Sequence, residues 1–245
     1  MSTKQIIDNF ASAIKDLCFP PACLLCKRPL RESSVLICPS CLDGLSFSLS
    51  PLCLRCGKVF ASREGEDHLC SSCMTGELFY HKARSLFVYN DHIAPLIHDF
   101  KYGGCTAGLR TFAGLKEEMN VGADLSPPSL ILPVPLHRRR LRQRGFNQAV
   151  LLARALFPEE KYMIEPLILR REKDTRPQTS LSGRERRHNL KGAFRVEGVE
   201  KIAGRNILLI DDVLTTGTTV NECARVLSLA GAGRIEVFTL ARVLE

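Results

Sequence analysis

The stretch ILLIDDVLTTGTTV, residues 207–220, carries the clearest indication of fold class in this chain. It opens with four consecutive apolar residues, 207–210, and such a run is typical of a parallel strand buried on both faces. Asp211 and Asp212 fall where this strand is expected to end. A short turn rich in threonine follows and leads into a helix that carries Val220, Ala224, Val226 and Leu227. Strand, turn and helix in this order indicate an α/β domain.

The turn has the chemistry of a phosphate site. Backbone amides at a helix N-terminus point outward, and the helix dipole favours an anion there. The two acids would repel the same phosphate, but they can accept hydrogen bonds from sugar hydroxyls, directly or through a divalent cation. The stretch therefore predicts a pocket for a ribose 5-phosphate. The alternative is a buried strand, a surface turn and a capped helix without a ligand. The lysine-bearing loop of nucleotide triphosphatases is excluded, because no Gly-Lys-Ser/Thr sequence is present.

Length and composition are ordinary for a globular protein. The 245 residues suffice for one large domain, or for a medium domain with a small one, and 45% of them are hydrophobic. The longest apolar runs are far shorter than the ~20 residues that cross a bilayer. Because the first ten residues, MSTKQIIDNF, also lack the apolar core of a signal peptide, we expect a cytoplasmic protein without a membrane span. Residues 4–17 carry apolar side chains on one helical face and are expected to form a helix packed on its own protein.

The net charge of +8 is concentrated in two segments. Five arginines and no acid lie between Arg138 and Arg144, and residues 170–191 hold eight basic residues against three acidic ones. Such clusters indicate a polyanionic partner, which could be pyrophosphate, a nucleotide or nucleic acid. A solubilising surface is the alternative, and charge alone does not exclude it.

Eight of the eleven cysteines form four Cys-x-x-Cys pairs between Cys23 and Cys73. One such pair can hold a zinc ion from a tight turn, and a second pair completes the tetrahedron. The segment has too few large apolar residues for a core, so metal would supply its folding energy. Disulfides are disfavoured in the cytosol, and redox-active pairs would not recur four times. We predict two structural zinc ions in two stacked ribbons, paired sequentially rather than interleaved, with the ligands Cys23, Cys26, Cys38, Cys41, Cys53, Cys56, Cys70 and Cys73. Cys18, Cys105 and Cys223 are predicted to be ordinary buried thiols.

The rest of the chain supplies further strands and helices. ARSLFVYND (83–91) alternates toward a strand, and LILPVP (130–135), PLILRR (166–171) and IEVFTLAR (235–242) are predicted strands. Strands that alternate with helices imply a mostly parallel sheet with helices on both faces. HIAPLIHDFKYGG (92–104) is expected to be a helix, and its Lys101 could face a ligand phosphate, although a lone lysine is more often solvated.

Two basic segments follow predicted strands. The first is a loop at His137, Arg138 and Arg139 that enters an amphipathic helix. Ligands bind at the carboxyl ends of parallel strands, and guanidinium groups suit pyrophosphate, although an exposed basic loop is the alternative. Gly145, Asn147 and Gln148 either shape this turn and cap the helix or touch a ligand. The second segment, 172–194, has little apolar periodicity and is predicted to be a lid that excludes water from a diphosphate.

Several stretches together closely resemble the ComF family, whose members are linked to natural competence and DNA uptake. LLIDDVLTTGTT resembles the phosphoribosyl-pyrophosphate (PRPP) motif of type I phosphoribosyltransferases. The family resemblance also rests on CLLC with its flanking FPP, HDFKYGG, PVPLHRRRLRQRGFNQA and RPQTSLSGRERRHNLKGAF. It covers the chain nearly end to end, and RGFNQA is its most specific part. It implies a type I phosphoribosyltransferase-like domain at 79–245, preceded by an N-terminal helix and a double zinc ribbon at 1–78.

The resemblance also implies roles for individual residues. Asp211 and Asp212 would be the catalytic acids that bind the ribose hydroxyls and Mg²⁺. The 5-phosphate would be held by the turn, Thr215, Thr216, Gly217, Thr218 and Thr219. Pyrophosphate would be held by the basic loop and the lid, through His137, Arg138, Arg139, Arg184 and Arg187.

Two functions remain open. In the first, the protein is an enzyme that displaces pyrophosphate from PRPP with an acceptor that the sequence does not reveal. In the second, the fold is a nucleotide-sensing scaffold whose zinc ribbons and arginines bind single-stranded DNA during competence. The second predicts salt-dependent DNA affinity, but the chain has no Trp and only four Tyr for base stacking. A third, weaker hypothesis is that the ribbons dock a competence or recombination protein.

Overall fold

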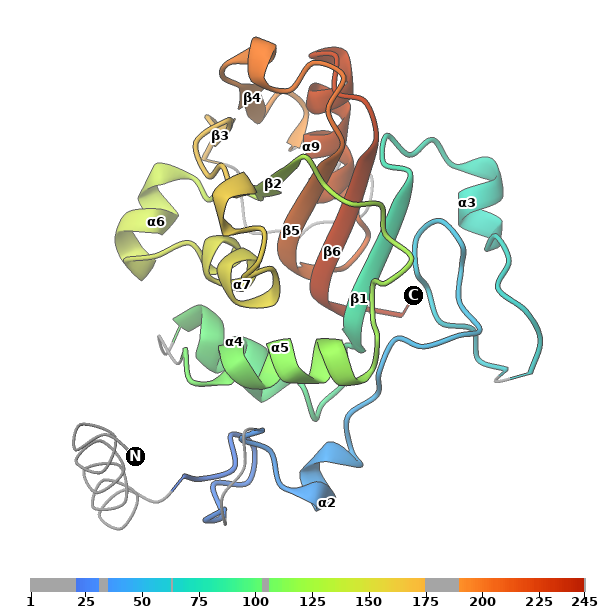
Figure 1. Cartoon of the computed structure of the whole chain (residues 1–245), viewed down its shortest axis with the longest axis vertical. Helices are drawn as coiled ribbons and strands as arrows, with labels where there is room; N and C mark the ends of the chain where they lie inside the picture. The colour runs from blue at the N-terminus through green and yellow to red at the C-terminus, as the bar shows by residue number, and fades with distance from the viewer. Residues whose placement is uncertain (1–20, 31–34, 63, 103–105, 175–189, 245) are drawn as a thin grey trace, which may run out of the picture.

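The computed structural model describes residues 21–30, 35–62, 64–102, 106–174 and 190–244 (Figure 1). Its main sheet is wholly parallel, with the strand order β1-β6-β5-β2. These strands are β1 (Lys82–Val88), β6 (Ile235–Arg242), β5 (Ile207–Leu214) and β2 (Leu130–Pro133). They are rich in branched and aromatic side chains, which suit a pleated surface buried on both sides. The predicted α/β class with a parallel sheet is confirmed.

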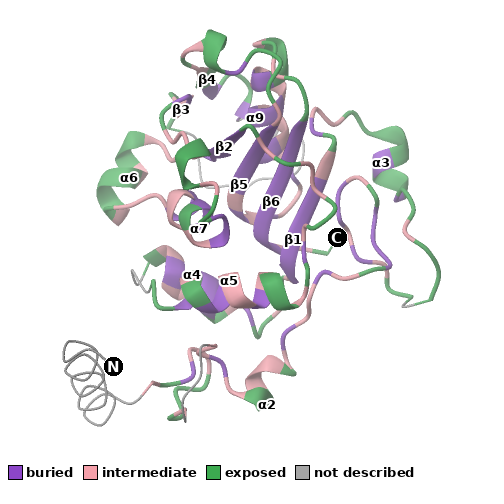
Figure 2. Ribbon diagram, viewed as in Figure 1, coloured by how far each residue is buried: buried purple, intermediate pink, exposed green. Residues whose placement is uncertain are grey.

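Helices cover both faces of this sheet, because side chains alternate along each strand. Leu208 and Ile210 of β5 lie in one core with the helices α4 (Ala94–Tyr102), α5 (Gly108–Glu118) and α7 (Gln148–Leu156). Ile207 and Leu209 face the opposite side and pack with α9 (Thr218–Leu229). Figure 2 shows the sheet strands buried along most of their length. The expectation of helices on both faces is therefore correct.

The strand β5 is longer than the apolar run predicted. Asp211 and Asp212 lie inside it, and the strand ends only at Leu214. The reason is its neighbour β6, because Asp211 stands opposite Thr239 and Leu214 opposite Arg242 in the parallel register. Pairing with a strand of eight residues extends β5 past the point where its own apolar pattern stops.

The strand β1 does not alternate between buried and exposed residues as predicted. Its five central residues are all buried, although it lies at one end of the strand order. Backbone groups from the cysteine-rich region cover its outer edge. Ala83 N–H donates to Arg55 O at 2.7 Å, and Val88 N–H donates to Ser46 O at 2.7 Å. The sheet edge is thereby closed to other chains.

The predicted strand at 166–171 does not join the main sheet. Its last part, β3 (Leu169–Arg171), pairs antiparallel with β4 (Phe194–Val196) in a separate two-stranded sheet. Bonds from Glu197 N to Ile168 O and from Glu172 N to Ala193 O continue the pairing at both ends. The predicted lid residues Arg184 and Arg187 lie outside the described residues.

The two cysteine-rich ribbons contact different parts of the α/β domain. The first contains α2 (Pro39–Leu42) and lies below α4 and α5 in Figure 1, where Leu36 N–H donates to Thr111 Oγ1 at 3.0 Å. The second contains α3 (Ser71–Thr75) and lies beside β1. The prediction that the ribbons stack on each other is therefore wrong. The first ribbon packs in one core with α4 and α5, and the second ribbon is hydrogen-bonded to β1 and β6.

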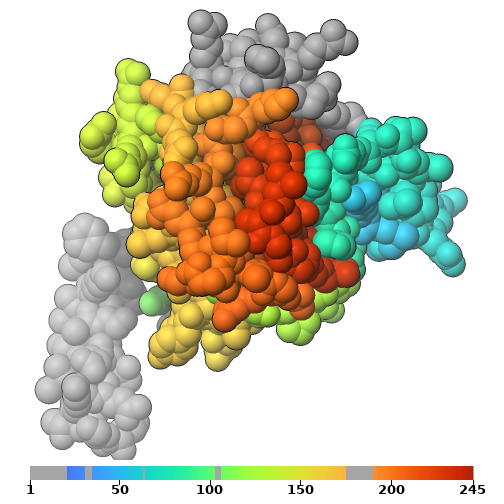
Figure 3. Space-filling model, turned by 90° about the horizontal axis from the view of Figure 1, so that it is seen from above, coloured from blue at the N-terminus to red at the C-terminus, as the bar shows by residue number. Residues whose placement is uncertain are grey.

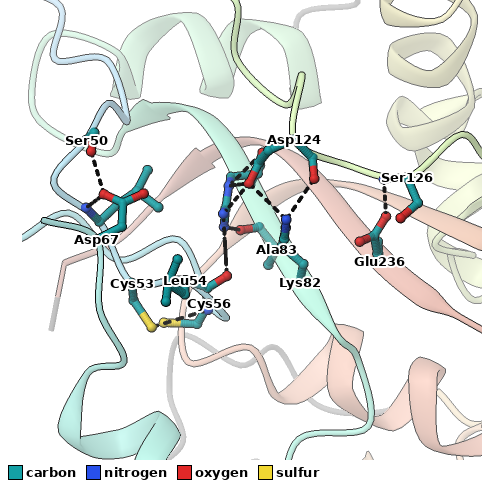
Figure 4. Close-up of polar contacts among 12 residues, drawn as sticks. Ser50, Cys53, Leu54, Cys56, Asp67, Lys82, Ala83, Asp124, Ser126 and Glu236 are labelled. Carbon is teal, nitrogen blue, oxygen red and sulfur yellow. Dashed lines mark hydrogen bonds and ion pairs between the residues drawn. The ribbon is translucent and has the colours of Figure 1, made fainter.

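An ion pair between buried Arg84 of β1 and half-exposed Asp124, after α5, lies where the second ribbon meets the sheet (Figure 4). The Arg84 side chain, 5% exposed, donates from Nε to Asp124 Oδ1 at 3.0 Å and from Nη2 to Oδ2 at 2.5 Å. Its Nη1 also reaches Leu54 O of the ribbon at 3.4 Å. Lys82 Nζ also lies 3.1 Å from Asp124 Oδ2, and Figure 4 shows the two residues next to each other. Asp124 therefore compensates the charge of an arginine that closes the junction.

We expect Asp124→Asn to lower the free energy of unfolding at pH 7 by about 1 kcal/mol, because buried Arg84 loses its charged acceptor, although water partly screens the half-exposed Asp124. Burial alone would raise the pKa of Asp124, but hydrogen bonds from Arg84 and Lys82 outweigh it and hold this pKa below its ordinary value. Such a carboxylate stabilises the fold above its unfolded pKa, and that stability is lost as the pH falls through the folded pKa. Urea unfolding at several pH values should show the difference between wild type and variant shrinking below about pH 4.

The matched control is Asp91→Asn, which changes an exposed acid after β1. It should unfold like wild type at every pH. An Asp124→Asn variant with the same loss at pH 3 as at pH 7 would contradict the role assigned to this ion pair.

Candidate functional site

The eight predicted zinc ligands form two separate groups of four. One consists of Cys23, Cys26, Cys38 and Cys41, the other of Cys53, Cys56, Cys70 and Cys73, and the sulfur atoms of each group lie within 4.8 Å of one another. None of the eight forms a disulfide. Four cysteine sulfurs at such distances match the donor set of structural zinc, so the two groups fit two zinc ions. Sequential pairing is confirmed, and the interleaved alternative is wrong.

The three cysteines outside the pattern differ in what the structure shows of them. Cys223 is completely buried on α9, as predicted, and burial raises the pKa of its thiol well above the ordinary value. Cys18 and Cys105 lie outside the described residues.

Near the carboxyl end of β5, Asp212 is held by two side chains from distant elements. Its carboxylate Oδ2 accepts a hydrogen bond from Gln148 Nε2 of α7 at 2.9 Å. Its Oδ1 lies 3.2 Å from Lys101 Nζ of α4. Asp212 is only 5% exposed, so these two partners replace the water that its charge would otherwise require.

Asp211 has a different environment, because alternation along the strand turns it away from Asp212. It is half-buried, and its Oδ1 accepts a hydrogen bond from the Asp212 backbone N–H at 2.9 Å. Burial and the neighbouring Asp212 charge raise the pKa of Asp211 to about 7, although Lys101 and Arg171 act in the opposite direction. The two acids thus differ in burial and in the partners that hold them.

The turn after β5, where the sequence predicts a phosphate site, leads directly into α9. Gly217 adopts a left-handed conformation with φ of 74° and begins α9 without a side-chain cap. The hydroxyls of Thr216 and Thr218 lie 2.7 Å apart, and all four threonines of the turn, from Thr215 to Thr219, are half-buried. An uncapped first turn with hydroxyls beside it is suited to an anion.

The segment that leaves the second ribbon packs against Gly217 and the first turn of α9. The Tyr80 hydroxyl lies 3.6 Å from the position a Cβ would take at Gly217. Asn221 of α9 accepts the Phe79 N–H at 2.8 Å and donates its own backbone N–H to Gly217 O at 2.9 Å. In Figure 3 the cyan surface of the second ribbon and β1 borders the red surface of the C-terminal residues. The segment that leaves the ribbon is therefore packed against the turn before α9.

The predicted basic loop after β2 is instead a short helix, α6 (Arg138–Arg144). His137 caps it, since its Nδ1 lies 3.4 Å from Arg139 N, and Gly145 ends it in the left-handed conformation at φ of 79°. The seven residues between the cap and the left-handed glycine suffice for local helical hydrogen bonds, which a loop of the same length would leave to water. Arg138 and Arg139 are exposed.

Asp174 joins two of the predicted pyrophosphate residues. One of its oxygens lies 3.4 Å from His137 Nδ1 and the other 3.4 Å from Arg139 Nη1. The position predicted for an anion is thus next to a carboxylate of the same chain. Arg138 makes no ion pair among those of the described residues.

Three contacts of this site were not predicted. Asn147 caps α7 through Ala149 N at 3.0 Å, but the adjacent Gln148, for which both roles were open, contacts Asp212. Lys101 contacts the acid rather than solvent, and Asp174 had no assigned role. The position of Gln148 and Lys101 in the chain could have indicated their contacts with Asp212. Gln148 starts a helix and Lys101 ends one near the carboxyl edge of a parallel sheet.

Comparison with known protein families separates a cysteine-rich N-terminal part from the α/β domain. Residues 14–74 match the double zinc ribbon domain family, and residues 143–245 match the phosphoribosyl transferase domain family. The parallel sheet, the turn before α9 and the two tetracysteine groups thus define a phosphoribosyltransferase-like protein with a double zinc ribbon.

Three relatives of similar length show which family within this class the chain belongs to. DNA utilization protein YhgH of Escherichia coli strain K12 is 32% identical over 235 residues, which are 93% of this chain and 100% of that protein. Competence protein F of Haemophilus influenzae is 32% identical over 229 residues, 90% of this chain and 96% of its own. Competence protein ComFC of Bacillus subtilis is 30% identical over 224 residues, 90% of this chain and 83% of its own. The chain belongs to the ComF family.

A solved structure is similar at greater distance. The glutamine PRPP amidotransferase from B. subtilis, complexed with ADP and GMP, aligns to 58% of this chain and 30% of its own length. At 16% identity and a TM-score of 0.35, this likeness is too distant to carry a functional argument. In the described part of the chain, no helix is long and apolar enough to span a membrane.

Proposed function

We propose that this protein binds PRPP with Mg²⁺ and transfers its phosphoribosyl group to an acceptor, with release of pyrophosphate. The observation that carries the proposal is the uncapped N-terminus of α9 behind a threonine-rich turn, next to two acids at the end of a parallel strand. The turn from Thr215 to Thr219 would take the 5-phosphate, and Asp211 and Asp212 the ribose hydroxyls. This arrangement separates the anion-binding groups from the acids, as a sugar phosphate requires.

The acids also fit a divalent cation, because carboxylate oxygens are preferred ligands of Mg²⁺. Bound there, Mg²⁺ would neutralise part of the diphosphate charge. His137, Arg138 and Arg139 at the start of α6 would bind the remaining diphosphate oxygens, together with Arg184 and Arg187. In the transfer, the bond between the anomeric carbon and the pyrophosphate oxygen breaks, pyrophosphate leaves with the electron pair, and the acceptor atom bonds to the same carbon.

The zinc ribbons serve a structural purpose in this proposal. Residues 1–78 and 79–245 would be two units of the protein, joined by the segment 77–80, where Phe79 N–H donates to Asn221 of α9. A cytoplasmic location would keep the eight cysteines reduced and available to zinc.

Isothermal titration calorimetry with PRPP and Mg²⁺ tests the binding step. We expect a dissociation constant in the low micromolar range, much weaker binding when Mg²⁺ is removed with EDTA, and weaker binding of ribose 5-phosphate or pyrophosphate alone. A folded, zinc-loaded protein that gives no heat with PRPP would refute the proposal. With binding established, pyrophosphate release can be used to screen acceptors.

A second candidate function is binding of single-stranded DNA. It is favoured by the exposed arginines of α6, namely Arg138, Arg139 and Arg142, and by relatives named for competence and DNA utilization. In this case PRPP or a nucleotide would act as a signal rather than as a substrate. Fluorescence anisotropy with an oligonucleotide should then show affinity that falls steeply with salt, and neutralising these arginines should reduce the salt dependence.

A further inference from the structure

Both oxygens of the Asp212 carboxylate are occupied by side chains of this chain. Gln148 Nε2 donates to Oδ2 at 2.9 Å, and Lys101 Nζ lies 3.2 Å from Oδ1. The Asp212 side chain is 8% exposed and that of Lys101 is 23% exposed, so this is the most deeply buried lysine–carboxylate pair among the described residues. A charge so little exposed needs a partner in every state of the protein.

The two partners of Asp212 differ in how easily they can leave. Gln148 is 5% exposed in the first turn of α7, packed beside the buried Ala149. Lys101 lies in the last turn of α4, whose backbone is anchored by the buried Leu96, Ile97 and Phe100. Its ammonium sits on a flexible four-carbon stem and can move while the helix stays in place.

A divalent cation on Asp212 could not share Oδ1 with the Lys101 ammonium. Two positive groups a few ångströms apart in a site of low solvent exposure repel each other strongly. If a metal-bound diphosphate enters, the displaced ammonium finds new acceptors in the phosphate oxygens brought by the same ligand. A compact, three-donor cation is suited to that change of partner.

We propose that Lys101 is the internal counter-ion of Asp212 in the empty site, and that it moves to the diphosphate of the ligand when a divalent cation binds the acid. This inference rests on the proposed function for the identity of the ligand. Lys101 would then have a second role. Its positive charge disfavours binding of the metal alone and favours binding of the metal together with the diphosphate. The site would thus take a metal–diphosphate complex in preference to either component alone.

The first test uses Mn²⁺ alone as the probe and therefore needs no PRPP. Mn²⁺ binding to wild type and to Lys101→Met is measured by electron paramagnetic resonance. We expect the variant to bind Mn²⁺ about tenfold more tightly, because a competing positive charge is removed. Without metal, its thermal unfolding temperature should fall, and Mn²⁺ should restore it more than in wild type. Lys101→Arg keeps the charge and should bind Mn²⁺ as weakly as wild type.

The second test titrates the same proteins with PRPP and Mg²⁺. Lys101→Met should bind PRPP about tenfold more weakly, the opposite direction to its Mn²⁺ affinity. The matched control is Lys27→Met, because Lys27 is an exposed lysine of the first ribbon that contacts Asp99 at 3.8 Å and Leu24 O at 2.8 Å. It should leave both affinities unchanged.

The outcomes separate this inference from the proposed function. Equal Mn²⁺ affinity in wild type and Lys101→Met, or no Mn²⁺ binding to either, would overturn the counter-ion role. Unchanged PRPP affinity in Lys101→Met would overturn its movement to the ligand. If Lys101→Met tightens Mn²⁺ binding but no protein binds PRPP, the counter-ion role stands and the proposed function fails.

Discussion

Cys53→Ser should lose one of two zinc ions and about 5 kcal/mol or more of unfolding free energy, because a structural zinc site supplies folding energy directly. Cys53 is completely buried, and its sulfur accepts hydrogen bonds from the backbone N–H groups of Cys56 and Cys70 at 3.5 and 3.4 Å. A serine hydroxyl is a poor replacement for a zinc-bound thiolate.

The effect of Cys53→Ser should extend beyond the ribbon itself. Arg55 of the same ribbon donates to Leu78 O at 2.7 Å, and Arg242 at the end of β6 donates to Cys56 O at 2.8 Å. The ribbon therefore holds both the edge of the sheet and the segment that packs against the turn before α9. We expect the variant to expose β1 and to aggregate on heating.

Zinc content by elemental analysis and stability by urea unfolding measure this prediction. Cys223→Ser is the matched control, since Cys223 is equally buried but lies on α9 outside both tetracysteine groups. The control should keep two zinc ions. Two zinc ions per chain in Cys53→Ser would contradict the ligand assignment.

The Asp211→Asn, Asp212→Asn double variant should bind PRPP with Mg²⁺ at least about 100-fold more weakly than wild type. Charge-assisted contacts to a ligand in a little-exposed site contribute 2 to 5 kcal/mol or more, and an amide is a poor ligand for Mg²⁺. The fold should survive, because Asn at position 212 retains an oxygen that can accept from Gln148 or Lys101.

Calorimetric titration beside wild type measures this loss. Asp43→Asn is the control, since Asp43 is an exposed acid at the end of α2, and its affinity should equal that of wild type. DNA binding, if present, should persist in the double variant, because the exposed arginines of α6 are intact. Persistence of PRPP binding in the double variant would show that the acids are wrongly assigned.

Local sequence patterns were sufficient to predict the features that depend on residues close together along the chain. Four apolar residues at 207–210 predicted a strand buried on both faces, and the structure places them in the sheet. Four Cys-x-x-Cys pairs predicted two sequential metal groups, because each pair is formed within a single turn. These features follow from spacing along the chain.

Tertiary structure decided what depends on contacts between distant segments. Gln148 reaches Asp212 across 64 residues, and neither residue alone signals the other. β1 is buried because the two cores cover its faces and backbone groups of Ser46 and Arg55 cover its outer edge. The segment 166–171 leaves the main sheet because β4 offers an antiparallel partner. Sequence periodicity specifies which residues are buried, but a charged residue's partner is set by which elements the fold brings together. Hence the acids were predictable from sequence, whereas the lysine and glutamine that hold Asp212 became evident only in three dimensions.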